Sequence, residues 1–149
     1  MTSEGEVTLR EITSETVRAI CNLEVRPEQR SYVAPNAVSI AQAHFEPQAW
    51  FRAVYAAETP VGFVMLSEDP EKREYYLWRF MIAGEHQGKG YGKRALDLVV
   101  EYVRALPGAR ELTSSFVPGE AGPRDFYLRY GFVETGEVED REHVIRLEL

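Results

Sequence analysis

Cysteine is almost absent from this chain of 149 residues, because Cys21 is its single cysteine. A disulfide within the chain is therefore excluded. Cys21 lies close to the apolar residues Ile20 and Leu23, and a free cysteine is commonly buried. We therefore expect Cys21 to be a small core residue, with a catalytic thiol as the alternative.

Long hydrophobic runs are also missing. No apolar stretch approaches the roughly 18 residues that a membrane-spanning helix needs. Residues 1–6 have neither a basic start nor an apolar stretch, so we expect no signal peptide. A cytoplasmic protein without a membrane partner is the resulting expectation.

The chain has no excess of basic residues. It carries 17 Lys and Arg against 24 Asp and Glu, a formal net charge of −7. General binding of nucleic acid relies on basic side chains that neutralise phosphates, so a nucleic-acid partner is not expected. An acidic surface raises the local concentration of amines and agrees with a cationic substrate.

Clustered metal ligands are missing as well. His44, His86 and His143 show no metal-ligand spacing with Cys21 or with one another. We therefore expect no metal.

The composition that remains is that of an ordinary folded domain, with 44% hydrophobic and 28% charged residues. A chain of this length buries roughly 70% of the surface that its unfolded state exposes. We expect a single domain over residues 1–149.

Hydrophobic patterning predicts seven strands and four helices. The predicted strands are 7–12, 50–57, 61–68, 75–82, 111–117, 132–137 and 143–149. The first predicted helix is capped by Thr13 or Ser14 and ends near Leu23, and the second follows Asn36 with Ser39 as candidate cap. The third begins within residues 87–93 and ends before Pro107, and the fourth covers residues 123–130. The order β-α-α-β-β-β-α-β-α-β-β predicts an α/β or α+β domain, with a mixed, mostly antiparallel central sheet flanked by helices.

Three glycines, Gly88, Gly90 and Gly92, lie between a hydrophobic strand and the most amphipathic helix. Glycine lets backbone N–H groups approach a ligand closely. The first N–H groups of a helix have no internal partner and attract a pyrophosphate. Lys89 and Lys93 add positive charge there, so we expect a phosphate-binding loop, with a loop that holds no ligand as the alternative.

Two familiar nucleotide-binding loops do not fit this segment. A P-loop needs Ser or Thr after Gly-Lys, but Gly90 follows Gly88 and Lys89. The dinucleotide fingerprint needs a glycine where Lys93 stands, and it follows the first strand of a parallel βαβ unit rather than a fourth strand. The helix N-terminus is therefore expected to hold the pyrophosphate of another ligand.

Residues 87–92, Gln-Gly-Lys-Gly-Tyr-Gly, resemble the [RQ]-x-x-G-x-[GA] signature of the GNAT superfamily of acyl-CoA-dependent N-acyltransferases. Residues 126–132, Phe-Tyr-Leu-Arg-Tyr-Gly-Phe, resemble the C-terminal signature of that superfamily, and the order of elements is similar over nearly the whole chain. The resemblance implies an enzyme that transfers an acetyl group from acetyl-CoA to a primary amine by direct attack in a ternary complex.

The resemblance also implies where acetyl-CoA binds. The pyrophosphate is expected on the loop formed by Gln87, Gly88, Lys89, Gly90, Tyr91, Gly92 and Lys93. The pantetheine arm is expected to pair with Phe80, Met81 and Ile82, where the strand separates from strand 111–117. A backbone N–H near Met81 or Ile82 would polarise the thioester carbonyl.

Tyr127 corresponds to the tyrosine that commonly protonates the departing CoA thiolate in this family, and a neutral phenol is a suitable acid at pH 7. Simple core packing beside Phe126 and Tyr130 is the alternative. The chain departs from the family pattern at Glu120, where Asn is frequent, and at Pro123, where Ala is frequent. The contacts of that Asn with the pantetheine arm are thereby in doubt.

The general base stays open at this point. An alkylamine with a pKa near 10.4 must lose a proton before it attacks. Where polyamine acetyltransferases carry an acidic residue, this chain has Trp78. Glu85, Glu24 and a chain of waters are the candidates.

The stretch from Leu23 to Ala43 resembles that of bacterial GNAT proteins grouped with the spermine/spermidine acetyltransferases, which favours a polyamine-like acceptor. Tyr32 and Trp78 are the candidate walls of its pocket, since aromatic faces attract cations. Acetylation of a protein N-terminus or lysine, and a CoA-binding sensor with little catalysis, are the competing functions. Strand edges in such sheets often pair, so a homodimer is a further expectation.

Overall fold

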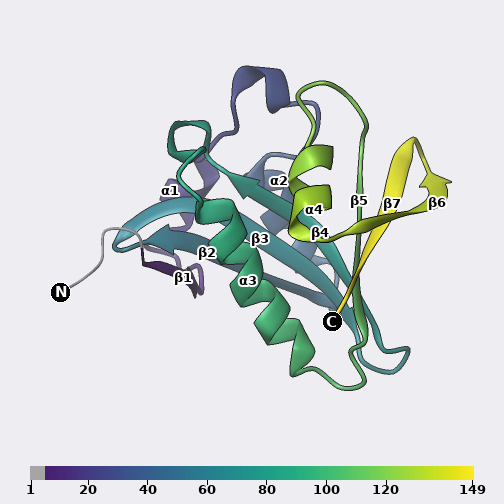
Figure 1. Ribbon diagram of the computed structural model, residues 1–149. Coiled ribbons are helices and arrows are strands. Elements are labelled where there is room, and N and C mark those ends of the chain that lie inside the picture. Colours follow the sequence, from purple (N-terminus) through teal and green to yellow (C-terminus); the bar gives the residue numbers. More distant parts are fainter. Residues whose placement is uncertain (1–5) are drawn as a thin grey trace.

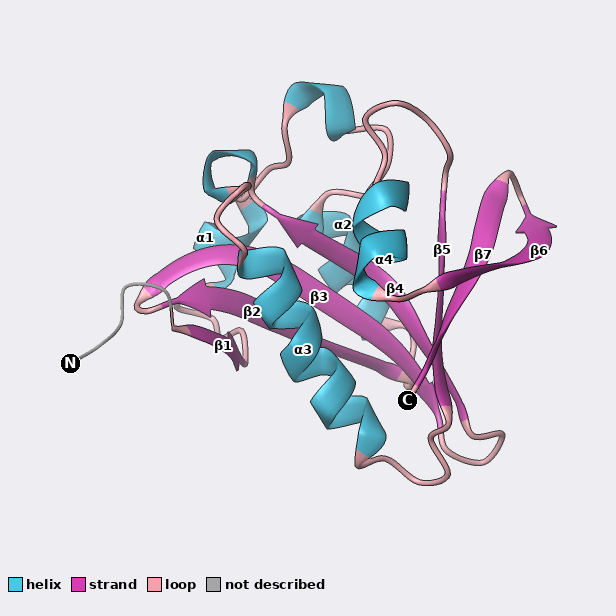
Figure 2. Ribbon diagram, in the orientation of Figure 1, coloured by secondary structure: helices cyan, strands magenta, loops and turns pink. Residues whose placement is uncertain are grey.

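The computed structural model describes residues 6–149 (Figures 1 and 2). Residues 1–5, part of the segment for which we expect no signal peptide, lie outside the described residues. The elements are β1 (Val7–Arg10), α1 (Val17–Cys21), η1 (Pro27–Gln29), α2 (Asn36–His44), β2 (Ala49–Ala56), β3 (Thr59–Asp69), β4 (Glu74–Ile82), η2 (Gly84–His86), α3 (Tyr91–Arg104), β5 (Glu111–Phe116), α4 (Arg124–Tyr130), β6 (Val133–Glu139) and β7 (Glu142–Glu148). The predicted order of strands and α-helices is confirmed, with two short 3-10 helices added.

Seven strands form one sheet in the order β1-β2-β3-β4-β5-β7-β6. Neighbouring strands are antiparallel except β4 and β5, which are parallel. In Figure 1, α3 and α4 lie in front of the sheet, with α1 and α2 behind it. The predicted α+β architecture with a mixed, mostly antiparallel sheet is therefore confirmed.

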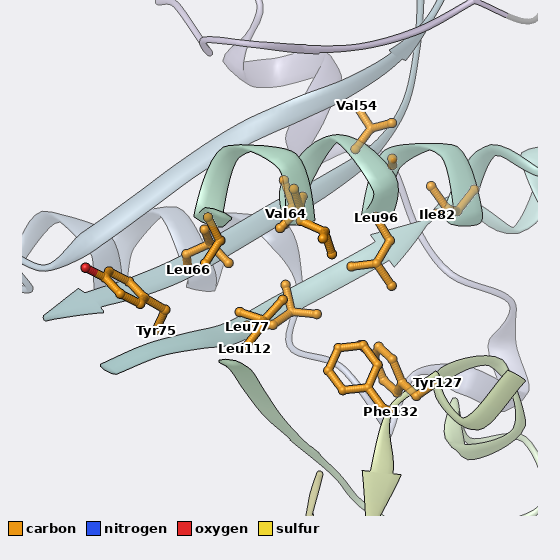
Figure 3. Packing of buried hydrophobic residues seen from close by; sticks show 14 of the residues in the cluster. Val54, Val64, Leu66, Tyr75, Leu77, Ile82, Leu96, Leu112, Tyr127 and Phe132 are labelled. Carbon is orange, nitrogen blue, oxygen red and sulfur yellow. The ribbon is translucent and has the colours of Figure 1, made fainter. Parts of the chain in front are cut away.

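Each face of the sheet carries its own core. Along β3, Val64 and Leu66 join the cluster beneath α3, whereas Phe63 and Met65 join the cluster beneath α1 and α2. Successive side chains of a strand point to opposite faces, which explains this division. The apolar stripe of α3 is buried as its spacing predicts, and Figure 3 shows Leu96 packed over the strands.

A β-bulge interrupts β4 at Trp78. Met65 of β3 pairs with Arg79 and the next residue, Leu66, pairs with Leu77, so Trp78 is the extra residue. A bulge directs two consecutive side chains to one face. Trp78 packs into the cluster beneath α1 and α2, and Arg79 Nη2 donates to Gln42 Oε1 of α2 at 3.0 Å.

The predicted caps of the first two helices were wrong. The N-cap position of α1 is Thr16, whose side chain makes no capping hydrogen bond, because Thr13 forms a turn whose carbonyl accepts hydrogen bonds from the N–H groups of Thr16 and Val17. In α2 the helix already begins after Pro35, whose ring fixes φ, so Ser39 is buried inside it.

Cys21 is half-buried rather than fully buried at the end of α1. In the part of the chain that the structure describes, no helix is both long and apolar enough to cross a membrane.

Candidate functional site

A cavity of about 1230 Å³ lies where β4 and β5 diverge. The two strands pair only at Tyr76 with Thr113 and at Leu77 with Ser114, although β4 continues to Ile82 and β5 continues to Phe116. The predicted separation of these strands is thus confirmed. The cavity is lined by residues beyond the last pair, including the expected pantetheine-binding residues Phe80, Met81 and Ile82.

One end of the cavity is the N-terminus of α3. Gly88 and Gly90 have φ of 81° and 82°, a left-handed conformation that strains other residues. The first turn of α3 contains no acidic residue, and no side chain of the described residues caps it. Its first N–H groups have no helical partner and point out of the helix end. With Gly88, Gly90, Tyr91, Gly92 and Lys93 among the lining residues, this end is suited to an anion.

The two lysines of the loop differ. Lys93 lines the cavity, and its Nζ lies 3.2 Å from Asp97 Oδ2 one turn later. Lys89 is exposed and is not among the residues that line the cavity. A contact of Lys89 with the ligand, through its backbone N–H, therefore stays a prediction.

Gln87 connects the loop to two other parts of the chain. Its Nε2 donates to the carbonyl of Ile82 at 2.9 Å and to Gln29 Oε1 at 2.8 Å. Gln29 Nε2 donates back to Gln87 Oε1 at 3.2 Å. The loop is thereby attached to the end of β4 and to η1, a role for Gln29 that the sequence did not indicate.

Tyr127 of α4 lines the cavity and is only 6% exposed. Its ring lies 5.3 Å from that of Phe132 and 5.5 Å from that of Phe126, so it packs in the core as well (Figure 3). Burial raises the pKa of Tyr127 well above its ordinary value, partly opposed by a hydrogen bond with Ser114. The phenol therefore stays neutral and keeps its proton.

Tyr32 and Trp78, the predicted acceptor residues, both line the cavity. Tyr32 packs closely on the β5–α4 loop, where its ring leaves no room for a Cβ at Gly119 and very little at Gly122. The segment between α1 and α2 and the loop after β5 therefore meet at the cavity wall through this ring.

Arg79, Ser115 and Glu142 are among the lining residues that the sequence reasoning missed. Ser115 Oγ donates to Glu142 Oε1 at 3.0 Å and also shares a hydrogen bond with the hydroxyl of Tyr76. Glu142 reaches Ser115 because β7 pairs with β5. No local pattern indicates such a neighbour, since the two residues are distant in sequence.

The candidate bases named from the sequence lie elsewhere. Glu24 is 71% exposed and lies 3.6 Å from Arg30, and Glu85 is 78% exposed and lies 3.6 Å from His86. Neither glutamate is among the residues that line the cavity, whereas Glu142 is.

The histidines are dispersed: His86 lines the cavity, while His44 and His143 belong to α2 and β7. Within residues 6–149, no group of three or more His, Cys, Asp or Glu side chains is arranged to hold a metal ion.

Comparison with known proteins identifies the family. The model of the acetyltransferase (GNAT) family matches residues 8–132, so the chain belongs to that family. The spermine/spermidine N(1)-acetyltransferase of Bacillus subtilis (strain 168) is 26% identical over 143 residues, which span 89% of this chain and 91% of that protein.

Solved structures agree on the fold. An acetyltransferase from Thermus thermophilus superposes with a TM-score of 0.77 at 17% identity, covering 98% of this chain and 99% of that one. The spermidine N-acetyltransferase of Vibrio cholerae, in complex with CoA and spermine, gives 0.73 at 22% identity, covering 96% and 94%. The predicted family and fold are confirmed, and the protein is an N-acetyltransferase.

Proposed function

We propose that the protein transfers the acetyl group of acetyl-CoA to a primary amine of a small molecule, by direct attack in a ternary complex. One observation carries the proposal: a single cavity joins the anion-binding N-terminus of α3 to the open edge of β4 and to the buried phenol of Tyr127. The donor, the acid and the acceptor wall thus share one space.

The donor fits the first part of this cavity. The N–H groups at the start of α3, after Gly90, would hold the pyrophosphate. Pairing of β4 with β5 ends at Leu77, so the edge of β4 beyond this residue has no β5 partner and can pair with the amides of the pantetheine arm. A backbone N–H at Met81 or Ile82 would then stabilise the oxyanion.

The chemistry needs a base and an acid. The ammonium group of the acceptor gives one proton to Glu142, directly or through water, and the free amine forms the C–N bond with the thioester carbon. Collapse of the tetrahedral intermediate breaks the C–S bond, and the thiolate takes the proton of Tyr127. One of the two protons then on the nitrogen passes to the phenolate through solvent, which leaves the amide with one N–H, and Glu142 later releases the proton it received.

The acceptor class is suggested first by the relatives. The Bacillus subtilis relative is named a spermine/spermidine acetyltransferase, which favours a polyamine-like acceptor. A CoA-binding sensor is the competing function, motivated by Trp78 where polyamine enzymes carry an acid and by the departures at Glu120 and Pro123. Acetylation of a protein N-terminus or lysine would use the same donor site.

The test is thiol release from acetyl-CoA with polyamines, amino acids, aminoglycosides and peptide N-termini, beside calorimetric binding of CoA. Turnover with any small amine supports the proposal. Binding of CoA without turnover on the panel favours the sensor, and failure to bind CoA refutes both functions. Size-exclusion chromatography of the same samples tests the expected homodimer, for which the exposed edge strand β6 is a candidate interface.

A further inference from the structure

Arg79 is a cation in the cavity wall that has no carboxylate partner among the described residues. Its guanidinium donates only to neutral acceptors, the carbonyl of Trp78 at 3.2 Å and Gln42 Oε1 at 3.0 Å. Its Nε is buried and has no hydrogen-bond partner within residues 6–149. Burial also lowers the pKa of Arg79 from its ordinary value, as expected of a cation that has lost water.

Arg52 of β2 provides an internal comparison. Both arginines donate to the carbonyl of the preceding residue, and both lie over a tryptophan ring. Arg52, however, has a carboxylate nearby, with its Nη2 3.8 Å from Glu11 Oε1, and it does not line the cavity. Arg79 therefore lacks the neighbouring carboxylate that Arg52 has, and Arg79 rather than Arg52 lines the cavity.

The carboxylates of the cavity are few and mostly engaged. Among the residues that the structure describes, Asp97, Glu142 and Glu148 are the acidic residues of its lining. Asp97 accepts from Tyr130 at 2.7 Å and from Lys93, and Glu148 is exposed. Glu142 attracts Arg79 only at long range, since it bonds to Ser115. A polycation would find two carboxylates here, Glu142 and the exposed Glu148, beside a guanidinium that repels it.

Arg79 is also close to the expected reaction centre. Met81 is one of the two residues whose N–H would polarise the thioester. Arg79 lies two residues before it, which is roughly 7 Å along the strand at about 3.3 Å per residue. An acceptor whose amine attacks at that point can reach Arg79 with a group only a few bonds away. Guanidinium binds carboxylate through paired, charge-assisted hydrogen bonds.

We propose that Arg79 binds a carboxylate of the acceptor, so that the enzyme acetylates amino acids or related amino-carboxylates rather than polyamines. This inference rests on the proposed acetyl transfer and sharpens its substrate class. Glu142 receives the ammonium group and Arg79 the carboxylate, so this pair of wall residues matches the two charges of the acceptor. Trp78 packs beside the guanidinium and limits its movement.

The experiment uses acceptors that differ only by a carboxylate: ornithine and putrescine, lysine and cadaverine, 4-aminobutyrate and propylamine. Thiol release gives kcat/KM for each with wild type, Arg79→Gln, Arg79→Lys and Arg52→Gln. Calorimetry measures binding of the same acceptors to the CoA-saturated protein, which needs no turnover.

For wild type, we expect the carboxylated member of at least one pair to be preferred by about 10- to 100-fold. Arg79→Gln should bring that ratio close to one while the affinity for CoA stays unchanged. Arg79→Lys should retain part of the preference, and Arg52→Gln should retain all of it. A wild-type preference for the decarboxylated member of every pair overturns the inference, as does an unchanged ratio in Arg79→Gln. If no acceptor releases thiol, the proposed acetyl transfer fails instead, and the binding ratios still decide the role of Arg79.

Discussion

The donor end of the cavity comes from one continuous stretch of chain, residues 80–93, whereas the acceptor end is assembled from four separate segments. The donor end follows from local features: a strand edge, left-handed glycines and a helix N-terminus. The acceptor end joins the segment around Tyr32, the bulge in β4, the β5–α4 loop and the start of β7. Under the proposed function, local chemistry thus defines the donor site, and long-range packing defines the acceptor site.

The largest expected effect falls on Tyr127, where the two ends meet. Tyr127→Phe removes the proton donor but keeps the ring packing, so kcat should fall about 100- to 1000-fold with little change in acetyl-CoA affinity. Stopped-flow thiol release and calorimetry measure the two quantities. Tyr75→Phe is the control, because Tyr75 is equally buried, bonds the carbonyl of Pro107 and does not line the cavity. Unchanged turnover in Tyr127→Phe refutes the acid assignment.

Gly90→Val tests the donor end alone. A β-branched residue is strained at a φ of 82°, so the loop should shift and acetyl-CoA affinity should fall about 100-fold. Gly136→Val is the matched control: Gly136 has a φ of 89° and equally open surroundings, but it lies in β6 away from the cavity. Circular dichroism checks that both variants fold. Retained affinity in Gly90→Val contradicts the phosphate-binding loop.

Trp78→Ala tests the acceptor end alone. Loss of the aromatic wall should raise the KM for the acceptor about 10-fold and leave the KM for acetyl-CoA unchanged. Trp50→Ala is the control. Trp50 stacks on Tyr102 and lies beneath the guanidinium of Arg52, but it does not line the cavity. An equal rise in both KM values, or the same rise in Trp50→Ala, argues against a separate acceptor wall.

Gln29→Ala tests the connection between the two ends. The change removes the reciprocal amide hydrogen bonds with Gln87. Acetyl-CoA affinity should weaken about fivefold, the equivalent of one net hydrogen bond of roughly 1 kcal/mol. The exposed Gln48→Ala serves as a control in the same calorimetric titration. An unchanged affinity would show that the loop holds its shape without η1.

The smallest expected effect concerns alkaline pH. A raised pKa means that Tyr127 remains protonated as the pH rises through about 10, the ordinary value for tyrosine. The kcat should therefore rise as the acceptor amine loses its proton and should show no fall up to about pH 10. A fall in kcat that starts near pH 9 and persists in Tyr127→Phe would assign the alkaline limit to another group.

Much of the fold was predictable because its signals are periodic and local. The order of elements, the buried stripe of α3 and the glycine loop before this helix all follow from residues within a few turns of one another. Helix starts were less predictable: Thr13 and Ser39 have the side chains of caps, but a turn before α1 and the fixed φ of Pro35 determined where the helices begin. Short helices leave too few residues for the pattern to locate their ends.

The positions of Tyr127 and of most residues predicted for the donor site, in the lining of one cavity, were predictable because these residues belong to short sequence signatures. The acceptor half was not. Glu24 and Glu85 were the carboxylates nearest to the predicted site in sequence, yet both point to solvent. Glu142 lies in the cavity because β7 inserts between β5 and β6, and Arg79 shares a face with Trp78 because of the bulge.

The sequence alone determined that this protein has a glycine loop at the start of an amphipathic helix, because glycine conformations and helix ends are properties of neighbouring residues. Only the tertiary structure decided which charges face the acceptor. One extra residue in β4 changes the direction of every side chain before it relative to those after it, and strand order decides which distant residues become neighbours. Arg79 and Glu142 come together through those two features, and the acceptor class that we propose rests on them.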